Sequence, residues 1–344
     1  MADPIRIGVL YDFPQHDGGE GFEEALRLGL AERADKLDRP TELHPLHVAG
    51  LPAGTERAVR DGFRALDEAG VLLVVGPSIS DNGLIVKELA DDARLPVINY
   101  TGGEITRGEW MFHYQVGSLE EEPVVLAQHL AERGLMSVGV LYDDSAVGRH
   151  YVDAFIAAAA DNSVEIVASS AVSSVAEDLS GPVKRMRDAE PVSLCYLGVG
   201  MAARPVALAV KELAWSVPVV ANSALMFGYI RKDWRADWEG WTYIDTIADD
   251  NPVRVALKQR APRTAAGSVG VAAYDIGRLI VDGIARGGHL TRAGVRHGLE
   301  HVKRLPATSG YAGTAMGFGV WDHAALKGGY LVLRQWRDGR SVQL

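Results

Sequence analysis

An internal repeat constrains the fold of this chain more than any other feature of its sequence. Each repeated segment ends an apolar run that opens into a loop, and three matches follow the same order at nearly the same spacing: Gly8–Asp12 with Gly139–Asp143, Leu73–Gly76 with Cys195–Gly198, and Leu95–Asn99 with Val217–Ala221. The repeat predicts two similarly built halves. In parallel α/β sheets ligands bind at the edge where the strands end, so two such edges facing one another predict a cleft for a small molecule.

Short apolar runs alternate with helical periodicity along the chain, which predicts a mostly parallel sheet in each half. Strands are expected at 5–10, 41–48, 71–75, 96–99, 111–115, 137–141, 165–171, 192–197, 218–221 and 240–244, and helices at 22–37, 55–69, 83–93, 120–133, 150–160, 179–189, 204–213, 269–286 and 292–302. The predicted fold class is therefore α/β, with two Rossmann-like lobes.

Length and element order set the expected domain division. At 344 residues the chain is too long for one ordinary domain, and the long helix after residue 250 has no counterpart within one repeat. We expect this helix to return to the first lobe, which gives an N-terminal lobe of 1–117 and 249–322 and a C-terminal lobe of 118–248 and 323–344. Several chain crossings then form a hinge that can close on a ligand between the lobes.

Charge and composition exclude several classes of function. The formal net charge of −10 disfavours binding of nucleic acid, which requires clustered Lys and Arg. The sequence has no uninterrupted run of 18 apolar residues, so no insertion into a membrane is predicted. The single cysteine, Cys195, cannot form an internal disulfide. The N-terminus shows no basic start, apolar stretch or lipid-accepting cysteine. We therefore expect a cytoplasmic location as the sequence stands, or a periplasmic or extracellular one if a leader has been removed.

The order of the motifs resembles the type I periplasmic binding proteins, and within them the branched-chain amino-acid and amide receptors of ABC importers. The resemblance rests on the strand and glycine-rich loop of 8–21, on Val75–Ser80, on Leu95–Thr101 and on the ending 310–336, and it spans essentially the whole chain. It implies three hinge crossings and a solute-binding protein without catalysis, cofactor or metal. The implied partner is an ABC permease for an exported protein, or a regulatory partner for a cytoplasmic one.

The resemblance also implies which residues line the ligand site. In the family, the loop after Gly76 and Pro77 offers hydroxyl and N–H groups to a ligand carboxylate, and here Ser78 and Ser80 occupy that loop. Amino-acid receptors place an aromatic residue and an acid in the second lobe, at positions that Val147 and Ser223 hold in this chain. The expected ligand-binding residues are Tyr11, Phe13, Gly19, Ser78, Ser80, Tyr100, Thr101, Gly102, Val147, Tyr151, Gly200, Met201, Asn222, Ser223, Phe227 and Tyr274.

Departures from the family pattern bear on the ligand. With Ser223 at the acid's position, no Asp or Glu occurs within 213–232, and a buried ligand ammonium without a partner would be costly. The expected cleft side chains are instead aromatic or apolar, methionines among them, and these adapt to irregular apolar shapes. The sequence predicts a bulky hydrophobic or aromatic ligand, with a carboxylate for the Ser78 and Ser80 loop as an open alternative. Truncation of Tyr100 to alanine is expected to weaken binding and to leave thermal stability nearly unchanged.

Other classes of function stay open at this point. If the protein is cytoplasmic, its resemblance to cytosolic regulators of the same fold predicts a ligand sensor or carrier that serves a catabolic pathway. An α/β hydrolase-like enzyme would use Ser78 as nucleophile, but the final glycine of a nucleophile elbow is absent. A dinucleotide-binding enzyme would use the glycine pattern of 198–203, but the acid expected after the next strand is absent. A tryptophan cluster fits either a partner surface or packing within a lobe: Trp234, Trp238 and Trp241.

Overall fold

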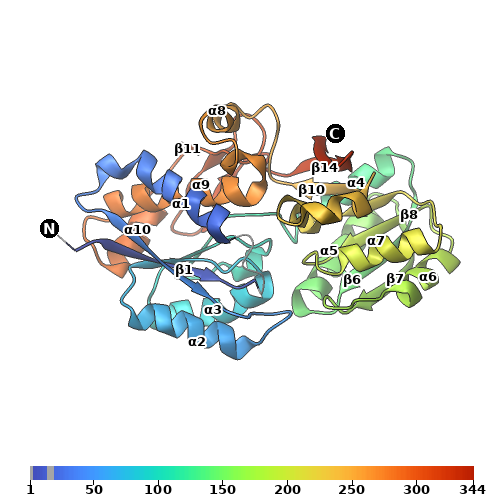
Figure 1. Cartoon of the computed structure of the whole chain (residues 1–344), viewed down its shortest axis with the longest axis horizontal. Coiled ribbons are helices and arrows are strands. Elements are labelled where there is room, and N and C mark those ends of the chain that lie inside the picture. Colours follow the sequence, from blue (N-terminus) through green and yellow to red (C-terminus); the bar gives the residue numbers. More distant parts are fainter. Residues whose placement is uncertain (1–2, 14–18) are drawn as a thin grey trace. The chain divides into compact units, whose positions relative to one another are not determined.

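The computed structural model describes residues 3–13 and 19–344, which divide into two compact units (Figure 1). Unit 1 comprises Met1–Val116 and Thr246–Tyr330, and unit 2 comprises Gly117–Asp245 and Leu331–Leu344. The third border follows residue 330 and not the expected 322. Residues 323–330 belong to unit 1 because the first of them pair with His113 of its sheet. Ala324 forms a β-bridge with His113, and the His113 backbone N–H donates to the His323 carbonyl at 2.8 Å.

Unit 1 is built on a five-stranded parallel sheet in the order β2-β1-β3-β4-β5. Its strands are β1 (Ile5–Tyr11), β2 (Thr41–His47), β3 (Leu73–Val75), β4 (Val97–Asn99) and β5 (Met111–His113). Every residue of β3, β4 and β5 is buried, as expected for apolar strands covered on both faces. The five expected strands of the first half are all present.

Helices cover both faces of this sheet (Figure 1). Helices α2 (Glu56–Glu68) and α3 (Ser80–Ala93) lie on one face, and α1 (Gly19–Glu32), α9 (Ser268–Arg286) and α10 (Arg292–Glu300) lie on the other. Helices α1 and α9 approach closely, because a Cβ on Gly29 would lie 2.0 Å from the Tyr274 carbonyl oxygen. The return of the long helix α9 to the first half of the chain is therefore made by direct backbone packing.

Shorter elements complete unit 1. Helix α8 (Pro252–Arg260) was not expected, although Asn251 and Pro252 form a recognisable start: the Asn251 side chain accepts hydrogen bonds from the Val253 and Arg254 backbone N–H groups. The remaining elements are the 3₁₀ helices η2 (Ala34–Lys36), η3 (Glu104–Thr106) and η6 (Thr264–Ala266), and a small antiparallel sheet of β11 (Leu305–Pro306), β12 (Ala315–Met316) and β13 (Leu326–Lys327).

Unit 2 repeats the α/β plan with a seven-stranded sheet in the order β15-β14-β10-β9-β8-β6-β7. The strands are β6 (Ser137–Asp143), β7 (Glu165–Val172), β8 (Ser193–Leu197), β9 (Val219–Ala221), β10 (Thr242–Asp245), β14 (Val332–Arg337) and β15 (Arg340–Gln343). The first five pair in parallel, whereas β14 and β15 add an antiparallel hairpin formed by the chain's last residues.

Four helices and two 3₁₀ segments pack on this sheet: α4 (Glu122–Glu132), α5 (Ala146–Asp161), α6 (Ser180–Asp188), α7 (Ala203–Glu212), η4 (Ser223–Tyr229) and η5 (Lys232–Trp238). The three tryptophans within and just after η5 are buried, since Trp234, Trp238 and Trp241 expose 9%, 0% and 6% of their surface. The cluster therefore packs inside the protein and is no exposed partner surface. No helix in the described part of the chain has the length and apolar character that crossing a membrane requires.

Candidate functional site

The carboxyl ends of β1, β3 and β4 bring most of the expected ligand-binding residues of the first half to one edge of the unit 1 sheet. The strands are parallel and adjacent, so the residues that follow them lie side by side. This edge carries Tyr11, Phe13, Ser78, Ser80, Tyr100, Thr101 and Gly102. Gly19 is the first residue of α1, and it directly follows 14–18, which lie outside the described residues.

Four aromatic rings form a row along this edge, which we call the aromatic row. The Tyr11 ring stacks on His47 at a centroid distance of 4.6 Å and meets the edge of Phe22 at 5.9 Å. Phe22 in turn stacks on Tyr100 at 4.6 Å, with the ring planes 25° apart. The row thus joins the ends of β2, β1 and β4 through the first helix. Phe22 and His47 were not expected in the site.

The loop after β3 is held by the carboxyl group of Asp12, which directly follows β1. One oxygen accepts hydrogen bonds from the Ser78 backbone N–H at 2.9 Å and the Ser78 hydroxyl at 2.6 Å. The other accepts from the Ile79 N–H at 2.9 Å and the Asn82 amide at 2.8 Å. Ile79 is the N-cap of α3 and has no side-chain acceptor of its own, so Asp12 supplies that acceptor from a neighbouring strand.

Burial dominates the electrostatics of Asp12. The residue exposes none of its surface, and this desolvation raises the pKa of its carboxyl group, while the hydrogen bonds from Ser78, Asn82 and Ile79 oppose the rise. Burial also raises the pKa of the Tyr100 hydroxyl well above its usual value, and the nearby charge of Asp12 adds to that effect. The Ser78 N–H and hydroxyl, which were expected to hold a ligand carboxylate, are therefore committed to the protein's own carboxyl group.

The loop after β4 is ordered by a second buried network. The Thr101 hydroxyl donates to the Asn99 side-chain oxygen at 2.9 Å, and Thr106 lies 3.1 Å from the same hydroxyl. His113 Nε2 donates to the Thr101 carbonyl at 2.8 Å, and Arg107 donates to His113 Nδ1. Burial lowers the pKa of His113 to about 3, so this imidazole stays neutral at physiological pH and the loop keeps one geometry.

Unit 2 repeats the arrangement at the edge where β6 and β8 end. Asp143 is the residue that matches Asp12 in the internal repeat, and its carboxyl group accepts from the Val199 N–H and the Tyr196 hydroxyl, each at 2.8 Å. Gly198 makes room for it, because a Cβ there would lie 2.4 Å from the Asp143 carboxyl carbon. Asn222 closes the loop from β9 by donating to the Gly198 carbonyl at 2.8 Å. Both repeats therefore use an aspartate to fasten the loop of a neighbouring strand.

A buried glutamate stands behind the loop after β9. Glu122, on α4, accepts the Ser118 and Ser223 backbone N–H groups at 2.7 Å each and also the Tyr151 hydroxyl. Because Glu122 is fully buried, desolvation raises the pKa of its carboxyl group to about 7. The acid that sequence reasoning sought close to Ser223 in the chain is thus supplied by a different helix.

Apolar side chains complete the edge of unit 2. Phe227 packs over Gly200, where a Cβ would lie 2.6 Å from the Phe227 ring, and the ring stacks on Trp234 at 5.9 Å. Met201 and Phe227 are partly exposed, whereas Val147 exposes only 5% of its surface. The expected residues of the second half therefore gather at one edge of the unit 2 sheet, with Tyr151 and Ser223 bound to the same glutamate.

Tyr274 is the expected residue that the structure does not bring to either edge. Its ring is buried, and its hydroxyl donates to Glu32 at the last position of α1 and accepts from Arg260. Because α1 runs from the carboxyl edge of the sheet to the opposite edge, Glu32 lies about 20 Å along the helix from Gly19. Tyr274 fastens α9 to α1 and α8.

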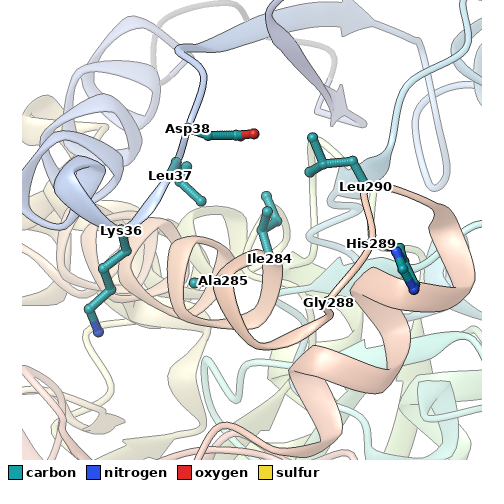
Figure 2. Close-up of a pocket in the computed structure, with 8 residues that line it drawn as sticks. All are labelled: Lys36, Leu37, Asp38, Ile284, Ala285, Gly288, His289 and Leu290. Carbon is teal, nitrogen blue, oxygen red and sulfur yellow. The ribbon is translucent and has the colours of Figure 1, made fainter.

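A pocket of about 210 Å³ lies elsewhere in unit 1 (Figure 2). It is lined by Lys36, Leu37 and Asp38 on one side and by Ile284, Ala285 and Gly288–Leu290 on the other. Asp38 shortly precedes β2, so the pocket lies where the parallel strands begin, at the edge opposite the expected ligand loops. None of the expected ligand-binding residues lines it. Among residues 3–13 and 19–344, no three His, Cys, Asp or Glu side chains group as ligands for a metal ion.

Comparison with known proteins identifies the family. A family model described as a periplasmic binding protein matches residues 4–339. Solved structures with a similar fold include a type 1 periplasmic binding protein from Bordetella pertussis Tohama I, with a TM-score of 0.85, 18% identity, and coverage of 99% of this chain and 100% of that one. The search of curated proteins found no match to the sequence.

Two further similar structures hold ligands. An ABC transporter substrate-binding protein from Desulfitobacterium hafniense, in complex with Leu, has a TM-score of 0.81 and 18% identity, and the match covers 99% of this chain and 100% of that one. A solute-binding protein of an ABC transporter from R. palustris, in complex with 4-hydroxybenzoate, has a TM-score of 0.82 and 16% identity, with 99% and 96% covered. At these identities the likeness shows the fold alone.

Proposed function

The chain belongs to the periplasmic binding protein family, and we propose that it is the receptor of an ABC importer for a bulky aromatic or hydrophobic small molecule. The family and the fold are those of non-enzymatic solute-binding proteins. The ligand would leave the protein chemically unchanged, and an ABC permease would be the partner that receives it.

The aromatic row carries the proposal about the ligand. Tyr11, Phe22 and Tyr100 stack or meet edge-on at 4.6 to 5.9 Å along the loops that follow the parallel strands of unit 1. Rings held in this way are pre-organised to stack on a further aromatic or apolar surface with little loss of side-chain freedom. Taken by itself, the edge of unit 2 carries adaptable apolar surface, since Met201 and Phe227 are both partly exposed there. The 4-hydroxybenzoate complex of the R. palustris protein supports an aromatic ligand on this fold.

The position of Glu122 bears on the alternative that the ligand is an ordinary α-amino acid. An acid does lie beside Ser223, so the lack of Asp and Glu within 213–232 does not by itself exclude an amino-acid ligand. Both oxygens of Glu122 are, however, already engaged by two backbone N–H groups and by Tyr151. This engagement supports a structural role for the carboxyl group and favours the aromatic ligand over an ammonium-bearing one.

Replacement of Tyr100 by leucine tests the proposal. The change removes the ring that ends the aromatic row and keeps an apolar side chain, so the affinity for an aromatic probe such as 4-hydroxybenzamide is expected to fall about tenfold, measured by isothermal titration calorimetry. Tyr100 exposes only 7% of its surface and stacks on Phe22, so its truncation also lowers the melting temperature, contrary to the expectation from sequence alone.

The matched control is Tyr311→Leu, the same change at a tyrosine of unit 1 that exposes 39% of its surface. This variant should bind the aromatic probe as the unchanged protein does. Titrations are run at a temperature where all variants are folded. Equal affinity of the Tyr100 variant and the unchanged protein would remove Tyr100 from the ligand site.

A further inference from the structure

The protein carries its own carboxylate at the point of unit 1 best suited to bind an anion. The start of α3 presents backbone N–H groups and the positive end of a 14-residue helix, which together favour a negative charge. Asp12 takes up this position: it accepts the Ser78 and Ile79 N–H groups, both at 2.9 Å. A ligand carboxylate at this loop would have to displace Asp12 or lie beside it.

Asp12 cannot easily be displaced, because both of its carboxyl oxygens accept hydrogen bonds from the protein. Its two oxygens accept four hydrogen bonds, and the residue exposes none of its surface. Asn82, one of the donors, also exchanges two hydrogen bonds with the Leu51 backbone, at 2.9 and 3.1 Å. Asp12 therefore connects the loops after β1, β2 and β3, and its removal would leave four donors without this acceptor, the buried Ile79 N–H and Asn82 amide among them.

Unit 2 shows the same arrangement, so an aspartate that accepts a backbone N–H from a neighbouring loop is a feature of both repeats. Asp143 takes up the Val199 N–H at 2.8 Å in the loop after β8, as Asp12 does in the loop after β3. Three arginines that follow the strand ends of unit 2 have acidic partners: Arg149 pairs with Asp144 at 2.7 Å, Arg204 with Asp237 at 2.9 Å and Arg231 with Asp233 at 3.1 Å. Within unit 2, these paired arginines attract an anion less than unpaired ones would.

We propose that Asp12 determines specificity by excluding ligand carboxylates from the Ser78 loop, so that the receptor takes a neutral aromatic or hydrophobic molecule and rejects its carboxylate analogue. This inference rests on the proposed function for the class of ligand, but the place of Asp12 on the loop donors does not depend on it. A carboxylate at this loop meets repulsion from Asp12 and finds the Ser78 and Ile79 N–H groups already engaged. A neutral amide or alcohol meets no charge repulsion there.

The first experiment measures the ratio of two affinities by calorimetry. The unchanged protein is expected to bind 4-hydroxybenzamide at least about tenfold more tightly than 4-hydroxybenzoate, its carboxylate isostere. In Asp12→Asn, which keeps the size of the side chain and removes its charge, the ratio should narrow toward one. A preference of the unchanged protein for 4-hydroxybenzoate, or an unaltered ratio in the Asp12→Asn variant, would overturn the inference.

The second experiment needs no ligand and so separates this inference from the proposed function. Asp12→Ala leaves a carboxyl-sized space lined by the Ser78, Ile79 and Asn82 donors, and sodium formate is expected to raise the melting temperature of this variant by about 2 °C over sodium chloride at equal ionic strength. The unchanged protein and Asp12→Asn, in which the space stays filled, should not respond to formate. If neither aromatic probe binds the unchanged protein, the proposed ligand class fails and the formate response alone decides the role of Asp12. Absence of that response in a folded Asp12→Ala variant contradicts the role.

Discussion

Replacement of Asp275 by alanine is expected to lower the free energy of unfolding by about 3–5 kcal/mol, the usual effect of removing one partner of a buried ion pair. Asp275 is fully buried on α9, where one oxygen accepts from Arg278 at 2.9 Å and from the Thr308 hydroxyl at 2.8 Å. The other accepts from the Thr308 N–H at 2.7 Å and from the Tyr114 hydroxyl at 2.9 Å. Alanine would leave all four donors without this acceptor, the Arg278 charge among them.

The location of Asp275 adds to the expected effect. Tyr114 lies two residues before the first border of unit 1, and Thr308 lies close to Gly310, whose N–H donates to Thr246, the first residue after the second border. The network therefore fixes the ends of two segments through which the chain leaves and re-enters unit 1. The unfolding midpoint in urea measures the loss. The control is Asp188→Ala, which removes an exposed helix ion pair with Lys184 and should leave the unfolding midpoint in urea nearly unchanged. Equal midpoints for the two variants would contradict the account of this network.

The second large effect concerns pH and Glu122. Burial raises the pKa of this carboxyl group from an ordinary 4.5 to about 7 in the folded protein. Between these values the folded protein binds a proton that the unfolded chain has released, so the contribution of Glu122 to stability is present below about pH 4.5 and is lost as the pH rises through about 7. We expect the unchanged protein to lose about 2–3 kcal/mol more than the Glu122→Gln variant between pH 5 and pH 8.

Urea unfolding of the unchanged protein and of Glu122→Gln at these two pH values measures the difference. The other charged groups, such as the pair of Glu120 with His150 at 3.2 Å, are the same in both proteins, so the comparison isolates Glu122. Glu132→Gln, at an exposed position at the end of the same helix, serves as the matched control and should follow the pH dependence of the unchanged protein. If Glu122→Gln follows it as well, the raised pKa of Glu122 is wrong.

The fold could be predicted from the sequence because the signals that specify it are local. The repeat of Gly8–Asp12 at Gly139–Asp143 marked the first strand of each unit, and apolar runs marked the other parallel strands. Helix α8 was missed because its mixed polar composition gives little periodicity, even though its Asn251 cap was readable. The third border was misplaced by eight residues because the pairing of Ala324 with His113 is a long-range contact without a local signal.

The chemistry of the candidate site could be predicted only in part, because it depends on side chains that meet from distant segments. Asp12 was visible in the repeat, but its role follows from the pairing of Val9 with Val75, which sets residue 12 against the Ser78 loop. Glu122 reaches Ser223 across 101 positions of sequence, and only the packing of α4 in unit 2 brings them together. A search for acids within the loop itself could not find it.

A melting-temperature panel tests the central claim, that the protein binds a neutral aromatic or hydrophobic molecule and leaves it unchanged. The panel contains 4-hydroxybenzamide, 4-hydroxybenzoate, leucine and glucose at one concentration, and each compound is recovered afterwards and checked for conversion. The account predicts that 4-hydroxybenzamide raises the melting temperature most and is recovered intact, because the aromatic row and Asp12 favour a neutral ring. A larger rise with leucine, glucose or 4-hydroxybenzoate, no rise with the amide, or conversion of any bound compound would contradict it.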